Sequence, residues 1–116
     1  MLPRLVKTLN FLLFHAIIPY EARIGKVRFE HRGLGVVIHP NTTIADGVVL
    51  HHHITIATDI PITDERRTVI GEGVVIYPHT VILGVRTIGA GATIRAGSVV
   101  TKDVAPGATV RGNPAR

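Results

Sequence analysis

The chain of 116 residues contains no cysteine and no tryptophan, and it has only two tyrosines and three phenylalanines. The absence of cysteine excludes disulfide bonds, thiolate zinc sites and a cysteine nucleophile, and it fits a protein of the reducing cytosol. Because aromatic residues are so few, the hydrophobic content of 46% is mainly aliphatic. We therefore expect a single domain, in a cytoplasmic protein, with a core of isoleucine and valine.

Acidic residues are also few: the sequence has 8 aspartates and glutamates against 13 lysines and arginines, which gives a formal net charge of +5. A basic balance suits a polyanionic partner, such as a phosphate-bearing cofactor, a nucleic acid or an acidic membrane surface. The basic residues are scattered along the sequence, and few aromatic residues accompany them. This pattern argues against a groove that binds nucleic acid.

What the sequence does contain is a repeat of six residues. Every sixth residue is β-branched and aliphatic across five consecutive hexads, namely Ile70, Ile76, Ile82, Ile88, Ile94 and Val100. A hexapeptide period is typical of a parallel β-helix, in which each flat side of a coil is a short strand. Strand residues two apart share a face, so the small residues Ala92 and Ser98 are also expected to point inward. The prediction is an all-β, single-stranded parallel β-helix over residues 18–116.

The hexad register also holds earlier in the chain, at Ile38, Ile44, Leu50 and Ile56. Two stretches interrupt it. Ile24 and Ile38 are fourteen residues apart, two more than two hexads, so residues 29–38 are predicted to bulge from the coil. Residues 57–69 combine a proline with charged clusters and have no inward period, which predicts an external loop. The tail, residues 101–116, is rich in proline and glycine and is expected to close the last coil.

No stretch of the sequence is long and apolar enough to predict a membrane-spanning helix. The first 17 residues carry apolar side chains at a helical period, with polar ones toward the other side at Arg4, Lys7, Asn10 and His15. They predict a short amphipathic N-terminal helix over residues 1–17, ended by Pro19. Open coils need covered ends, so we expect this helix to cap the first coil or to pack on a neighbouring subunit. Attachment to a membrane surface is the alternative.

Seven histidines permit three interpretations: metal ligands, a catalytic base or surface residues. The run from His51 to His53 resembles a metal cluster, but adjacent strand residues point to opposite faces, so at most His51 and His53 share one. Zinc carbonic anhydrases of the same coil class have a pair of histidines five residues apart, and no such pair occurs here. We therefore predict no metal site.

His31 is the stronger candidate for chemistry, because it lies in the predicted bulge, follows Glu30 and precedes Gly33 and Gly35. Glycines at such positions let a substrate approach the backbone closely. A neutral imidazole in a cleft is the side chain best suited to take a proton from a hydroxyl near pH 7. The alternative is a solvated histidine in a loop.

Residues 30–56 resemble the Asp-His-x-x-Gly-(Ile/Val)-Val-(Ile/Val) segment and the following hexads of serine acetyltransferases. Residues 88–100 and the ending Gly112-Asn-Pro-Ala-Arg116 are similar to the last coils and the closing turn of the same family. The resemblance extends over residues 18–116. It implies a left-handed β-helix, assembled as a homotrimer, with acetyl-CoA in a groove between adjacent coils.

The resemblance also implies roles for individual residues. His31 matches the general base that deprotonates an acceptor hydroxyl, which then attacks the thioester directly, without an acyl-enzyme. Glu30 replaces an aspartate, Arg66 matches an acceptor-binding arginine, and Arg67 replaces the histidine after it. The carboxylate that orients the catalytic imidazole falls near Ile17 and is missing. Glu30 or a residue of another subunit is the expected substitute.

On the cofactor side, the resemblance implies a second group of residues. Ala96 matches a position whose backbone meets the pantetheine arm, and Ala57 and Thr58 match the start of the loop beside the thioester. Lys102 and Arg116 lie near the end of the groove and are expected to meet the CoA phosphates. Their alternative role is that of ordinary surface cations.

Two departures from the family bear on the acceptor. Serine acetyltransferases carry a long helical domain before the coil, and after it a tail that docks on the next enzyme of cysteine synthesis. This chain has one short helix and no tail, which weakens serine as the acceptor and argues against a cysteine-synthase partner. It resembles instead the short relatives found with surface-polysaccharide genes, which acetylate sugar hydroxyls.

The sequence therefore predicts an acetyl-CoA-dependent O-acetyltransferase that acts on a hydroxyl of serine or a sugar. A non-catalytic, structural trimer is the alternative, and its support is the missing partner of His31 and the replacement at Arg67. A zinc-dependent, carbonic anhydrase-like enzyme comes third.

Overall fold

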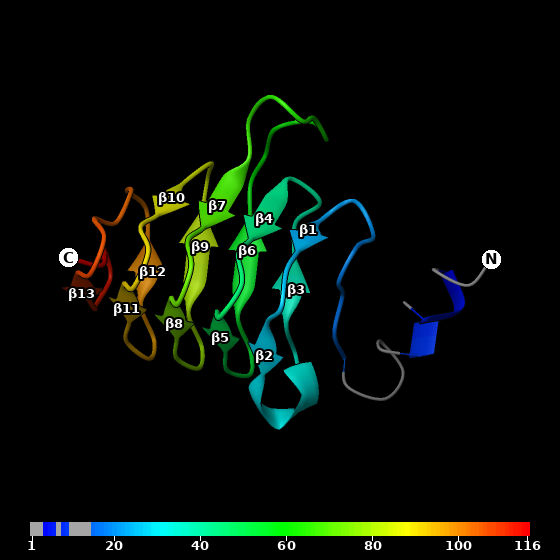
Figure 1. Cartoon of the computed structure of the whole chain (residues 1–116), viewed down its shortest axis with the longest axis horizontal. Coiled ribbons are helices and arrows are strands. Elements are labelled where there is room, and N and C mark those ends of the chain that lie inside the picture. Colours follow the sequence, from blue (N-terminus) through cyan, green and yellow to red (C-terminus); the bar gives the residue numbers. More distant parts are fainter. Residues whose placement is uncertain (1–3, 7, 10–14) are drawn as a thin grey trace.

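The computed structural model describes residues 4–6, 8–9 and 15–116. The chain winds into a prism of stacked coils, which begins near the N-terminal segment and ends at the C-terminus (Figure 1). The described residues contain thirteen strands, each of two or three residues. They form three parallel sheets, one on each side of the prism. We call these sheets I, II and III.

Each sheet takes one strand from each successive coil. Sheet I consists of β1 (Arg23–Ile24), β4 (Thr42–Ile44), β7 (Thr68–Ile70) and β10 (Thr87–Ile88). Sheet II consists of β2 (Arg28–Phe29), β5 (Val49–Leu50), β8 (Val75–Ile76), β11 (Thr93–Ile94) and β13 (Thr109–Val110). Sheet III consists of β3 (Val37–Ile38), β6 (Thr55–Ala57), β9 (Val81–Leu83) and β12 (Val99–Val100). The predicted parallel β-helix is therefore confirmed.

The strand register follows directly from the hexads. In a regular coil, paired residues such as Ile76 and Ile94 are eighteen positions apart, which is three hexads for three sides. Ile24 pairs with Ile44, two positions further than the regular spacing, and Ile56 pairs with Ile82, eight positions further. These excesses are the predicted bulge and external loop. The sequence interruptions thus leave the stacking of the strands intact.

The core is a column of aliphatic side chains along the prism axis. The predicted inward hexad residues are at most 1% exposed: Ile38, Ile44, Leu50, Ile56, Ile70, Ile76, Ile82, Ile88, Ile94 and Val100. The small inward residues Thr80, Ala92 and Ser98 are fully buried between them. Burying one such aliphatic side chain contributes about 1.5–3 kcal/mol. This alternation of large and small groups fills the narrow interior.

At some positions, the turns from sheet I to sheet II lie very close to the next coil. A Cβ atom added to Gly71 would lie 2.7 Å from the backbone nitrogen of Ala90 in the next coil. Such a distance is shorter than a nonbonded contact allows, so glycine is required there. The close approach of the coils therefore fixes the residue at this position of the turn.

The N-terminal helix ends earlier than predicted. Residues 4–6 and 8–9 are helical, whereas His15 and Ala16 are not, and Ile17 forms a parallel bridge with Val37. The amide of Ile17 donates to the carbonyl of Val36, and its carbonyl accepts from Ile38. Helix over residues 15–17 was wrong because the open edge of β3 offers that backbone strand-type partners. The rest of the predicted helix, residues 1–3, 7 and 10–14, lies outside the described residues.

The role predicted for this helix, as a cap or a contact with a neighbouring subunit, stays a prediction, as does its separation as residues 1–17 from the domain 18–116. In the described part of the chain, no helix has the length and apolar character needed to cross a membrane.

Candidate functional site

The turns that lead from sheet II to sheet III stack along the lower edge of the prism in Figure 1. We call this the II–III edge. Its first turn is the 3-10 segment η1 (Glu30–Gly33), which is the predicted bulge. The turns of the next three coils are residues 51–54, 77–80 and 95–98. Residues 111–116 close the last coil at this edge.

His31 lies at the tip of η1 in a rare backbone conformation. Its φ and ψ angles are 50° and 34°, and those of Arg32 are 57° and 24°. Two consecutive left-handed residues other than glycine cost on the order of 1 kcal/mol each. The turn is closed by two hydrogen bonds, from the amide of Leu34 to the carbonyl of His31 and from Val36 to Gly33. The fold therefore holds the exposed His31 side chain on a strained, well-tied turn.

Four imidazoles from three successive turns meet at this edge, and we call them the histidine cluster: His31, His52, His53 and His79. His52 is central. Its ring meets those of His31, His53 and His79 edge to face, with centroids 4.8, 5.3 and 5.4 Å away. The rings of His53 and His79 stack at 5.1 Å.

The histidine run does not lie on a strand, so the alternation assumed for it was wrong. Residues 51–53 form a turn, and His53 has a left-handed φ of 53°. His52 and His53 consequently both contact His79, whereas His51 stacks on Tyr77 with ring centroids 4.8 Å apart. The signal that could have found this cluster is the register. In the sequence, His53 and His79 are as far apart as the paired residues Ile56 and Ile82, so the two histidines occupy the same position in neighbouring coils.

The environment of His52 disfavours its charged form. Its Nδ1 atom is buried and has no hydrogen-bond partner. Burial lowers the pKa of His52, and the charges of His31, His53, His79 and His51 lower it further. Both effects favour the neutral form of the His52 imidazole. Within residues 4–6, 8–9 and 15–116, no three His, Asp or Glu side chains are arranged to hold a metal ion.

Glu30, the predicted partner of His31, is engaged elsewhere. Its Oε1 atom lies 2.6 Å from Nε of Arg28, and 28% of the Glu30 side chain is exposed. The ring in contact with His31 is that of His52. The structure therefore brings His31 together with a second imidazole.

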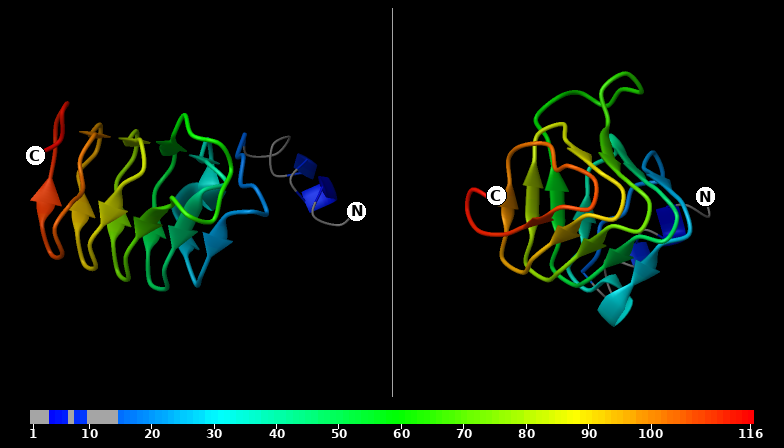
Figure 2. Two further views of the ribbon diagram at one scale, coloured as in Figure 1. Left: turned by 90° about the horizontal axis from the view of Figure 1, so that it is seen from above. Right: turned by 60° about the vertical axis from the view of Figure 1, so that its left-hand side comes forward.

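The turns from sheet III to sheet I form a second edge, which we call the III–I edge. The predicted external loop projects there as residues 58–67, between β6 and β7 (Figures 1 and 2). Beneath it lies an open hollow of about 460 Å³. Its lining includes the predicted cofactor residues Ala57 and Thr58, and it is completed by Asp59, Leu83, Gly84 and Arg86. Arg66 and Lys102 are exposed at the same edge.

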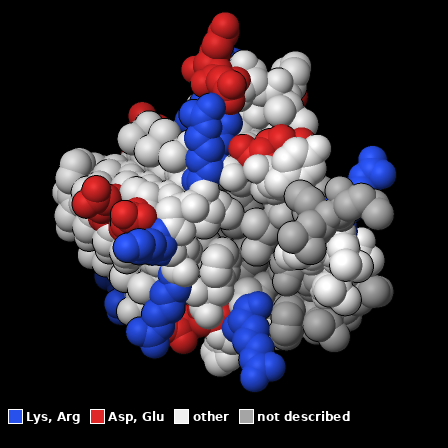
Figure 3. All heavy atoms as spheres, turned by 45° about the vertical axis from the view of Figure 1, so that its right-hand side comes forward, with Lys and Arg blue, Asp and Glu red and all other residues white. Residues whose placement is uncertain are grey.

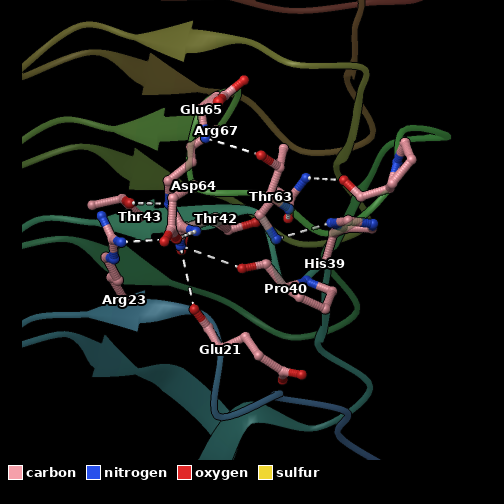
Figure 4. A network of polar contacts seen from close by, with 12 residues as sticks. Glu21, Arg23, His39, Pro40, Thr42, Thr43, Thr63, Asp64, Glu65 and Arg67 are labelled. Atoms are coloured by element: carbon pink, nitrogen blue, oxygen red, sulfur yellow. Dashed lines mark hydrogen bonds and ion pairs between the residues drawn. The ribbon is translucent and has the colours of Figure 1, made fainter.

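Arg67 anchors this loop to the prism (Figure 4). Its side chain is only 8% exposed. Nε donates to Oγ1 of Thr43 at 2.9 Å, and the terminal guanidinium nitrogens donate to the carbonyl of Thr42 at 2.7 Å and pair with Asp64 at 3.5 Å. Arg67 therefore directs its donors to the protein itself, a role that sequence comparison with a substrate-binding histidine did not suggest.

Asn41 is a second anchor of the same loop. Its side-chain amide donates to the carbonyl of Pro61 at 2.8 Å, and its oxygen accepts from the amide of Thr63 at 2.9 Å. Asn41 is 1% exposed, so both bonds are protected from water. The loop is thus held to the prism at Pro61 and Thr63 as well as at Arg67.

The predicted site residues fall on two edges of the prism. Glu30, His31, Ala96 and Arg116 belong to the II–III edge, and Ala57, Thr58, Arg66 and Lys102 belong to the III–I edge. Within one chain, the width of sheet III separates the two groups. On the face shown in Figure 3, lysines and arginines form separate groups with acidic side chains among them, in keeping with their scatter in the sequence.

Comparison with known proteins supports the fold and points to one family. Residues 67–102 match the family model described as bacterial transferase hexapeptide (six repeats). Serine acetyltransferase 2 of Arabidopsis thaliana is 42% identical over 95 residues, which are 82% of this chain and 29% of that protein.

Two solved structures share the fold closely. Soybean serine acetyltransferase complexed with serine matches with a TM-score of 0.86 and 39% identity, over 96% of this chain and 46% of that one. The serine acetyltransferase of Brucella abortus strain S19 in complex with coenzyme A matches with a TM-score of 0.86 and 29% identity, over 96% and 44%. The likeness confirms the left-handed β-helix. The chain spans less than half the length of each of these three relatives.

Proposed function

Because this chain is a hexapeptide-repeat protein related to the serine acetyltransferases, we propose that it is an acetyl-CoA-dependent O-acetyltransferase. The observation that carries the proposal is His31, an exposed imidazole on a strained turn of a fold whose relatives have been solved with coenzyme A and with serine. Strained residues concentrate at functional sites. The acceptor is a hydroxyl of serine or of a sugar. The cysteine-free sequence favours a cytoplasmic protein.

The proposed reaction needs one general base. The imidazole of His31 takes the proton of the acceptor hydroxyl as the oxygen attacks the thioester carbonyl carbon. The tetrahedral intermediate then collapses, the bond to sulfur breaks, and the coenzyme A thiolate receives the proton from His31. No covalent enzyme intermediate forms, which suits a chain without cysteine. Glu30, fixed by Arg28, lines the acceptor side next to His31.

We place the complete site between two copies of the chain in a homotrimer. The II–III edge of one copy contributes Glu30 and His31, and the III–I edge of the next contributes Arg66 for the acceptor. This arrangement is supported by the separation of the two groups within one chain. A cyclic assembly of three copies repeats the same contact three times.

The donor would lie in the groove between these edges. The hollow beside Ala57 and Thr58 would accommodate the thioester end, and the exposed residue Ala96 would meet the pantetheine arm. Lys102 and Arg116 are exposed cations that suit the coenzyme A phosphates.

The experiment is release of free thiol from acetyl-CoA with a panel of serine and sugar acceptors. We expect release with one acceptor class, and a loss of about 10²–10⁴-fold in His31→Ala. His51→Ala is the matched control, because His51 stacks on Tyr77 and is outside the proposed mechanism. Equal rates in native chain and His31→Ala would refute His31 as the base.

The shared site has its own test, by mixing His31→Ala and Arg66→Ala chains after reversible dissociation. If each site combines two copies, about a quarter of the sites in randomly mixed trimers carry both native residues, so activity returns. If His31 and Arg66 act within one chain, every site stays defective and nothing is regained.

A non-catalytic structural trimer is the second candidate, favoured by the engagement of Glu30 with Arg28. It predicts that the native chain neither binds coenzyme A nor releases thiol with any acceptor. Equilibrium binding of coenzyme A separates the two candidates.

A further inference from the structure

The histidine cluster contains one imidazole with an unmet bonding requirement. Nδ1 of His52 is buried without a hydrogen-bond partner, which is rare for a polar atom and calls for a physical explanation. The closest of the three rings around His52 is that of His31, with centroids 4.8 Å apart and planes at 85°. The unsatisfied atom thus belongs to the side chain that touches the proposed base.

The backbone fixes this pair of rings. The amide of His53 donates to the carbonyl of Leu34 at 2.8 Å, and the amide of Val37 donates to that of Ile54 at 2.9 Å. These bonds tie the turn that carries His52 to both ends of the segment following His31. The His53 ring also fills the space beside Gly35, where an added Cβ would overlap its Nδ1 atom. Neither turn can shift without breaking these contacts.

An imidazole that acts as a base needs a partner for its second nitrogen, because that partner sets the tautomer and the ring orientation. The carboxylate next in sequence, Glu30, is bound to Arg28. The lowered pKa favours the neutral form of His52, and the unprotonated nitrogen of that form is an acceptor for an N–H group. When His31 takes up a proton, both its ring nitrogens become donors.

We infer that His52 is a positioning residue, whose imidazole holds that of His31 in the orientation and tautomer that proton uptake requires; this inference rests on the proposed function. As His31 becomes an imidazolium, its second N–H donates to Nδ1 of His52. The bond fixes the base and stabilises the charge that it acquires. The other titratable groups facing His52 are His51 and His53 of its own turn and His79 of the next.

The decisive variant is His52→Phe, which keeps a ring in the cluster and removes both nitrogens. We expect kcat to fall about 10–100-fold, the scale seen when the hydrogen-bond partner of a metal-binding histidine is removed, with KM for acetyl-CoA unchanged. The acid limb of the pH–rate profile should move to lower pH by about one unit, because the imidazolium loses a charge-assisted hydrogen bond. His52→Gln, whose amide oxygen can accept, should recover part of kcat.

His79→Phe is the matched control, since its ring touches His52 and His53. It removes one histidine charge from the cluster and leaves the pair of His31 and His52 intact. We expect its kcat and its acid limb to match those of the native chain. An acid limb that stays in place in His52→Phe, or moves to higher pH, would show that His52 only packs against His31 and would overturn the inference.

A titration by NMR separates this inference from the proposed function, because it needs no turnover. In full-length native chain and in His52→Phe, the side-chain nitrogen shifts of His31 report its tautomer and its pKa. A lower pKa and a mixed tautomer in the variant support the positioning role, even where no acceptor yields thiol release and the proposed reaction fails. An unchanged pKa and tautomer overturn the role whatever the activity.

Discussion

Replacing Arg67 by alanine is the sharpest test of how the external loop is held. The guanidinium makes two short hydrogen bonds, to Thr43 Oγ1 at 2.9 Å and to the Thr42 carbonyl at 2.7 Å. Its contacts with the carbonyls of Pro40 and Glu21 are longer, at 3.3 and 3.4 Å. Counting only the two short bonds, at about 1.5 kcal/mol each for a charged donor, the variant should lose about 3 kcal/mol of unfolding free energy.

The neighbouring residue supplies the control. Arg66 has the same chemistry but is exposed, so Arg66→Ala should change the unfolding free energy by less than about 0.5 kcal/mol. Arg67→Lys keeps the charge but loses the planar fork of donors, and it should fall between native chain and Arg67→Ala.

The assay is urea denaturation of the three variants and the native chain at one protein concentration and pH 7. The same proteins should give the reverse order for acceptor binding. Arg66→Ala should raise KM for the acceptor more than Arg67→Ala does. Equal unfolding free energies in Arg66→Ala and Arg67→Ala would refute the assignment of Arg67 as the anchor.

Two further predictions concern the cluster and the core. The folded-state pKa of His52 lies below the value of 6.5 for an unfolded histidine, so its contribution to stability is complete above pH 6.5 and is lost as the pH falls. His52→Gln should flatten the acid side of a plot of unfolding free energy against pH, and an unchanged slope would contradict the explanation. Ile82 is fully buried, so Ile82→Ala should cost about 2–5 kcal/mol in urea denaturation. Its neighbour Leu83 is 41% exposed, and Leu83→Ala should cost under about 1 kcal/mol.

The hexads predicted the strands because a β-helix transfers its geometry directly to the sequence. From Ile70 to Val100 a large inward residue recurs every six positions, and six residues make one side of the prism. The period of the sequence therefore fixes which residues pair between neighbouring coils. The bulge at η1 was equally accessible, since the fourteen residues from Ile24 to Ile38 exceed two sides by two. Handedness and oligomeric state have no such trace in the spacing and came from resemblance.

The errors arose where local pattern and tertiary context disagree. Ala16 and Ile17 continue the apolar period of the preceding helix, and only the free edge of β3 converts Ile17 into a strand partner. The histidine run was judged by strand alternation, although it fills a turn in which His53 is left-handed. The contact of His53 with His79 depends on counting across an eight-residue insertion, which a purely local rule does not do.

The inward strand positions cannot carry the chemistry, which is in keeping with the division of the proposed site between two edges. Inward strand positions are committed to the core, and Gly71 lies too close to the backbone of Ala90 to carry a side chain. The two other edges each carry an insertion into the repeat, η1 with His31 on one and the loop with Arg66 on the other. A reaction that needs both a base and an acceptor-binding cation therefore requires two edges to face each other, which a single straight prism cannot provide and an assembly of parallel copies can.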